Sequence, residues 1–85
     1  MIDFEKWKLA VRKLELVQVD QMLPKVGDPA IVLAMLETGK FSVMPPIHLL
    51  GFTSWRATSV CGFYYGDTAA EAIVNACAAL PEARS

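Results

Sequence analysis

The chain has 85 residues, of which 54% are apolar and 20% charged, and its formal net charge is −1. This length predicts a single domain over residues 1–85, because two separate cores need more chain. The high apolar content and the balanced charge exclude an intrinsically disordered protein. The near-zero net charge argues against a general nucleic-acid binder, which needs excess positive charge to displace counterions from phosphates.

Neither a signal peptide nor a membrane span is indicated. The first residues lack a basic region followed by an apolar one, and no run of about 18 apolar residues occurs. Two cysteines, Cys61 and Cys77, are fewer than a secreted disulfide scaffold of this size usually carries. We therefore expect reduced thiols, no membrane partner and a cytoplasmic location.

The first predicted helix begins after Asp3, whose carboxylate suits an N-cap. An apolar stripe at helical spacing follows, made of Phe4, Trp7, Val11 and Leu14. The β-branched composition after residue 15 leaves the end of this helix open, either early or as far as Leu23. Pro24 stops it in either case.

A second, shorter helix is predicted from Pro29, with Asp28 as N-cap and Gly39 as the residue that follows the helix. Residues 30–36 are apolar around the whole helical wheel. A helix of this kind must be buried on all sides, and an 85-residue domain has little material for that. Part of this helix is therefore expected to face another chain.

The middle of the sequence predicts a small antiparallel sheet. Residues 41–44 alternate like a short strand and end at Pro45-Pro46, which cannot donate to a ladder. An apolar stretch over residues 47–52 is closed by Gly51. From Thr53 to Tyr65 the odd-numbered residues are the more apolar, as expected for a strand or hairpin with one buried face.

The last helix has the clearest signals. Thr68 and Glu71 form a capping box, small residues line one face over residues 69–80, and Pro81 ends the helix. The predicted fold class is α+β, with two N-terminal helices, a small antiparallel sheet and a C-terminal helix packed on it.

Candidate catalytic and metal-ligating residues are few. The single histidine, His48, has no second histidine or nearby cysteine at metal-ligand spacing. A thiol–imidazole pair of His48 with Cys61 or Cys77 has no local support, although a thiol-dependent enzyme stays a third hypothesis. The glycines form no phosphate-binding loop. We expect no cofactor, no metal and no catalytic activity.

Four basic residues lie on the first predicted helix. They are Lys6, Lys8, Arg12 and Lys13. The helical wheel splits them over two flanks, interleaved with Glu5 and Glu15, which is typical of a mixed, solvated surface. A small nucleic-acid-associated regulator that uses this helix is the alternative function, and specific nucleic-acid binding is not favoured.

A long charge-poor region is the most informative feature. Arg56 is the only formal charge between Phe41 and Gly66. Depletion of Lys, Asp and Glu beside aromatic residues and Arg is typical of protein interface cores. Either this region is an interface, with Trp55, Arg56, Tyr64 and Tyr65 as anchors and the four basic residues as a subsidiary surface, or the domain buries both sheet faces. The mean hydropathy of +0.36 favours a partner, or a homodimer through the 30–36 helix or the sheet.

Two segments carry a family resemblance. Trp55-Arg56-Ala57-Thr58 followed by Gly66-Asp67-Thr68-Ala69-Ala70-Glu71-Ala72-Ile73 resembles a module of small phage- and prophage-encoded proteins, including NinX-like ones. The similarity covers residues 55–80. It implies a mobile-element accessory protein in a bacterial host, and small α+β phage proteins include anti-CRISPR and other inhibitors that occlude a host complex. The function expected is therefore a non-catalytic protein-binding module, directed at a host or phage protein complex.

Overall fold

A computed structural model of the chain describes residues 2–17, 22–51, 53–59 and 62–80. The elements, in chain order, are α1 (Phe4–Lys13), α2 (Pro29–Gly39), β1 (Ser42–Met44), a 3₁₀ helix η1 (His48–Leu50), β2 (Trp55–Ser59), β3 (Gly62–Gly66) and α3 (Ala69–Ala78). The predicted α+β class, with two N-terminal helices, an antiparallel sheet and a C-terminal helix packed on it, is confirmed.

Helix α1 begins as predicted and takes the earlier of its two expected ends. The Asp3 carboxylate accepts hydrogen bonds from the backbone N–H groups of Glu5, at 2.7 Å, and Lys6. The helix ends at Lys13, and Glu15 then adopts a positive φ of 54°. Trp7 is buried, and its indole N–H donates to the carbonyl of Pro24 at 3.0 Å, which holds the following segment against the helix.

Helix α2 begins at Pro29 as predicted, but its C-terminal residue differs. Asp28 accepts from the N–H of Ala30, while Gly39 remains helical and Lys40 takes the left-handed conformation with φ of 55°. Glycine is still needed at position 39, because a Cβ there would lie 2.3 Å from the ring of Phe41. Glycine here provides room for the phenyl ring that leads into the sheet, and the next residue makes the turn.

The three strands form an antiparallel sheet in the order β1-β2-β3. Val43 pairs with Ala57, which pairs with Tyr64, and these residues lie on the inner face toward α3. The prediction that odd-numbered residues face inward holds in β2 and is wrong in β3. Ser59 pairs with Gly62, so an odd residue stands opposite an even one and the inward positions of β3 are even.

Helix α3 has the predicted N-cap, Thr68, and the Glu71 side chain bonds the backbone one residue before it. Thr68 Oγ1 accepts from the N–H of Glu71 at 3.1 Å, and the Glu71 carboxylate accepts from the N–H of Asp67 at 2.6 Å. Gly66 permits the close approach of the helix, because a Cβ there would lie 2.6 Å from the backbone nitrogen of Ala72. The helix ends at Ala78, before Pro81.

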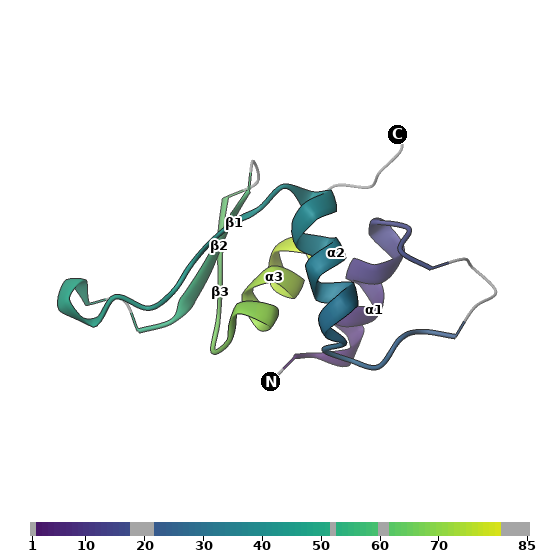
Figure 1. Ribbon diagram of the computed structural model, residues 1–85, viewed down its shortest axis with the longest axis horizontal. Helices are drawn as coiled ribbons and strands as arrows, with labels where there is room; N and C mark the ends of the chain where they lie inside the picture. The colour runs from purple at the N-terminus through teal and green to yellow at the C-terminus, as the bar shows by residue number, and fades with distance from the viewer. Residues whose placement is uncertain (1, 18–21, 52, 60–61, 81–85) are drawn as a thin grey trace.

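Figure 1 shows the sheet on one side, α3 in the middle, and α1 with α2 on the other side. Helix α3 packs on one face of the sheet and contacts both N-terminal helices, so it is the centre of the fold. The buried core is made of Trp7, Ala10, Val11, Met35, Phe41, Ala57, Ala72, Ile73, Val74, Ala76 and Cys77.

Two apolar surfaces are left open within the described residues. Helix α2 buries only Met35, and Leu33 is 55% exposed, so the predicted burial on all sides does not occur within one chain. The sheet has its inner face covered by α3, whereas Phe63 and Tyr65 on the other face remain exposed. The longest described helix has 11 residues, and none could cross a membrane.

Candidate functional site

The uncovered face of the sheet, called here the outer face, is built by strand register. Met44, Arg56 and Tyr65 lie in one row across the three strands. Ser42, Thr58 and Phe63 lie in the next row. Phe63 is 57% exposed and Tyr65 is 53% exposed, so two aromatic side chains of an edge strand face solvent. The outer face is therefore aromatic and nearly uncharged.

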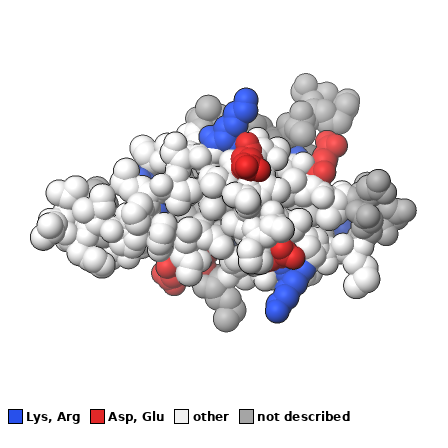
Figure 2. All heavy atoms as spheres, in the orientation of Figure 1, with Lys and Arg blue, Asp and Glu red and all other residues white. Residues whose placement is uncertain are grey.

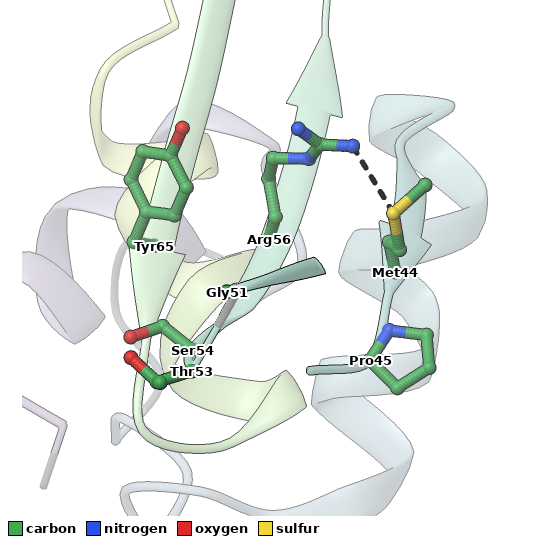
Figure 3. Close-up of a pocket in the computed structure, with 7 residues that line it drawn as sticks. All are labelled: Met44, Pro45, Gly51, Thr53, Ser54, Arg56 and Tyr65. Carbon is green, nitrogen blue, oxygen red and sulfur yellow. Dashed lines mark hydrogen bonds between the residues drawn. The ribbon is translucent and has the colours of Figure 1, made fainter. Parts of the chain in front are cut away.

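Arg56 is at the centre of the outer face, on the middle strand. Its Nη2 donates to the Met44 sulfur at 3.1 Å, and its guanidinium carbon lies 5.1 Å from the centroid of the Phe63 ring. Figure 3 shows the guanidinium between Tyr65 on one neighbouring strand and Met44 on the other. These contacts hold a cation within an apolar surface, where it is well placed to meet a carboxylate of a partner.

Between β1 and β2, the described residues 45–51 and 53–54 extend beyond the sheet as an arm (Figure 1). The short helix η1 lies in this arm, and Gly51 ends it with a positive φ of 83°. Leu49 is 99% exposed and Leu50 is also exposed, so two adjacent leucines contact no core. At the base of the arm a hollow of about 210 Å³ is bounded by Pro45, Thr53 and the Met44–Arg56–Tyr65 row.

Charge is distributed unevenly over the molecule. Figure 2 shows Lys, Arg, Asp and Glu over the helical part, whereas the end formed by the arm is uncharged on the side in view. Within the described residues between 41 and 66, Arg56 carries the one formal charge. The outer face and the arm are thus a continuous part of the chain that lacks the Lys and Glu of an ordinary solvated surface.

The four predicted anchors lie on both faces of the sheet. Arg56 and Tyr65 are on the outer face, whereas Trp55 and Tyr64 are half-buried on the inner face against the core. Phe63 was not among the predicted anchors, yet it is exposed on the outer face beside Arg56. Leu49 and Leu50 were also missed, although two leucines between Pro46 and Gly51 offered a signal for an exposed apolar turn.

The basic residues of α1 do not form one free patch. Lys13 reaches across to the C-terminus of α3, where its ammonium donates to the carbonyls of Ala78, at 2.8 Å, and Leu80. Lys8 lies 3.4 Å from the Glu5 carboxylate and 5.7 Å from the centroid of the Phe4 ring. Two of the four cations thus have partners within the chain, and Lys6 and Arg12 are exposed.

Cys77, the cysteine that the structure describes, has a thiol of low reactivity. Cys77 is buried in α3, and burial raises the pKa of its thiol to about 12. A thiolate is the nucleophilic form, so this residue is not activated at neutral pH. His48 lies in η1, within the arm, and Cys61 is outside the described residues. No group of three His, Cys, Asp or Glu side chains that could hold a metal occurs in the described part of the chain.

Comparisons with protein families, with curated proteins and with solved structures returned no match to this chain.

Proposed function

We propose that this protein is a non-catalytic binding module that docks through the outer face and the arm. Its partner presents an apolar protein surface with a carboxylate placed opposite Arg56. The observation that carries this proposal is the exposure of Phe63, Tyr65, Leu49 and Leu50 around a single cation. Burying such side chains against a partner stabilises a complex by roughly 25 cal/mol for each Å² of apolar surface.

The composition of this surface supports protein binding over other roles. Aromatic residues, Met and Arg are enriched at the centres of interfaces, and a desolvated Arg among aromatic rings is a frequent hot spot. The Met44–Arg56 and Phe63–Arg56 contacts already orient the guanidinium in the free chain. Less side-chain entropy is then lost when the partner binds.

The biological setting follows from the resemblance of residues 55–80 to phage modules. We propose a cytoplasmic protein in a bacterial host that occludes part of a host or phage protein complex. The arm suits such a role, because adjacent exposed leucines on a projecting segment enter an apolar recess more readily than a flat sheet does.

The test is binding of a purified partner, first captured from host lysate and identified, to the wild type and to variants. Arg56→Gln and the pair Leu49→Ser with Leu50→Ser each remove one part of the surface without touching the buried core. We expect each variant to weaken the dissociation constant by about tenfold or more, as for interface hot spots. Circular dichroism and thermal unfolding should match the wild type.

The matched control is Leu33→Ser, which alters an exposed leucine on α2 and leaves the outer face intact. It should bind as the wild type does. If Leu33→Ser abolishes binding while the outer-face and arm variants retain it, the partner docks on α2 and the proposal is wrong.

A further inference from the structure

Strand β3 leaves one edge of the sheet open. It is the last strand in the order β1-β2-β3, so within the described residues no strand pairs with its second side. The Asn75 side chain donates to the carbonyl of Tyr65 at 2.8 Å, so this carbonyl points away from β2. In an antiparallel strand the N–H and C=O of one residue point to the same side, and the sides alternate. Phe63 and Tyr65 therefore present their backbone polar groups to the open edge.

The other edge of the sheet is poorly suited to pairing. Strand β1 has three residues and is followed by Pro45-Pro46, which lack N–H donors. Short strands and prolines are the usual means by which proteins protect a sheet edge. Strand β3 has five residues, contains no proline and carries no charged side chain. It is the edge at which another strand would be added.

The sequence of β3 reads nearly the same in both directions about its centre, as Gly62-Phe63-Tyr64-Tyr65-Gly66. If a second copy pairs antiparallel with a two-fold axis at Tyr64, Gly62 lies opposite the partner's Gly66, and Phe63 opposite the partner's Tyr65. Both Phe63–Tyr65 pairs then exchange backbone hydrogen bonds and stack aromatic side chains on the outer face, where cross-strand aromatic pairs are favourable. The Tyr65 carbonyl has two lone pairs, so it can accept from Asn75 and from the partner together.

The surface beside β3 offers room for a second copy. Beside β3 an open groove of about 470 Å³ is lined by Leu9 of α1 and by Asn75, Ala78 and Ala79 of α3. A second copy on the edge covers this groove, and the small alanines permit the close approach of its helix.

We infer that the chain forms a two-fold symmetric dimer in which β3 pairs with β3 of a second copy, giving one continuous six-stranded antiparallel sheet. Such an isologous interface uses the same patch twice and closes at two subunits. The inference goes beyond the proposed function, because it concerns a second copy at the strand edge and groove. The two surfaces share Phe63 and Tyr65, whereas Leu49 and Leu50 of the docking surface lie in the arm, outside the strand pairing.

The first test uses no substitution. Light scattering over a wide range of protein concentrations should give the mass of a dimer that dissociates on dilution. Amide hydrogen exchange followed by NMR should show the Phe63 and Tyr65 amides protected in the dimer and exposed on dilution. The amide of Tyr64, which points toward β2, should be protected throughout. A monomer at all concentrations, or unprotected Phe63 and Tyr65 amides in a dimer, would overturn the inference.

The second test uses charge pairing across the two-fold axis. Phe63→Lys with Tyr65→Lys places like charges opposite each other in both pairs and should raise the dimer dissociation constant at least about tenfold. Phe63→Lys with Tyr65→Glu removes the same aromatic rings but places opposite charges together, so it should remain dimeric. If both variants fold and both are monomeric, the antiparallel register is wrong. These measurements contain no partner protein, so failure of the dimer and failure of the docking proposal are separate results.

Discussion

Single residues set the two features on which the candidate site depends. Gly39 makes room for the Phe41 ring, which is buried at the start of the sheet. The Arg56 guanidinium contacts both the Met44 sulfur and the Phe63 ring. The sequence could indicate that Arg56 was unusual, since it is the one charge in a long uncharged stretch. It could not indicate the role of Gly39, because the contact with Phe41 depends on how the ring turns back against the helix.

The buried thiol leads to a prediction at high pH. The pKa of Cys77 is raised by burial from 9.0 to about 12, so the folded chain keeps a proton that the unfolded chain loses above pH 9. Stability contributed by the protonated thiol is complete below pH 9. It falls as pH rises toward 12, at up to about 1.4 kcal/mol for each pH unit.

Chemical denaturation at several pH values should reveal this loss as the difference between the wild type and Cys77→Ala, which has no thiol to titrate at this position. Iodoacetamide at neutral pH should leave Cys77 unmodified in the native protein and label it in denaturant, as read by mass spectrometry of peptides. Rapid native labelling of Cys77 would contradict the burial and would restore the thiol-enzyme hypothesis.

At the scale of elements, periodicity and capping residues predicted the features that depend only on neighbouring residues, such as helix starts. The start of each helix follows from Asp3, Asp28-Pro29 and Thr68, because a cap needs only a few neighbouring residues. The inward side of β3 was predicted wrongly, because it depends on the pairing of Ser59 with Gly62 and therefore on the hairpin register. Tyr64 consequently faces the core, and Phe63 faces solvent.

Lys13 joins the first and last helices, and this contact gives a prediction. Its ammonium bonds the carbonyls of Ala78 and Leu80 at the negative end of the α3 dipole. Lys13→Met should therefore destabilise the protein by about 1 kcal/mol, measured by chemical denaturation. The control Lys8→Met removes an exposed pair with Glu5 and should change stability by about 0.5 kcal/mol or less. Equal effects of the two variants would show that the Lys13 contact adds nothing.

At the scale of the whole molecule, the α+β class and the order of elements could be predicted, because each follows from patterns within a segment. The layering could not, since it requires knowing that α3 lies between the sheet and the other helices (Figure 1). The exposure of the outer face was one of two readings left open by the sequence. The outer face is exposed because, within the described residues, no second layer of helices or strands covers it.

The charge distribution of the molecule predicts weak nucleic-acid binding. With Lys8 and Lys13 engaged within the chain, Lys6 and Arg12 leave α1 with about two cations for phosphate contacts, so binding through this helix should give a slope of log K against log salt of no more than about −2 in size. Fluorescence anisotropy with labelled DNA and RNA at several salt concentrations measures it. A steeper slope that is lost in Lys8→Ala or Arg12→Ala would favour the nucleic-acid regulator instead.

The contact between α1 and α3 also bears on how the protein is made. The buried residues of α1 are Trp7, Ala10 and Val11, and the element that α1 contacts most is α3, which follows every other described element along the chain. During synthesis these apolar side chains therefore leave the ribosome before the helix that packs on them. The native packing of α1 can form only when α3 has also been made, so it is a late step of folding.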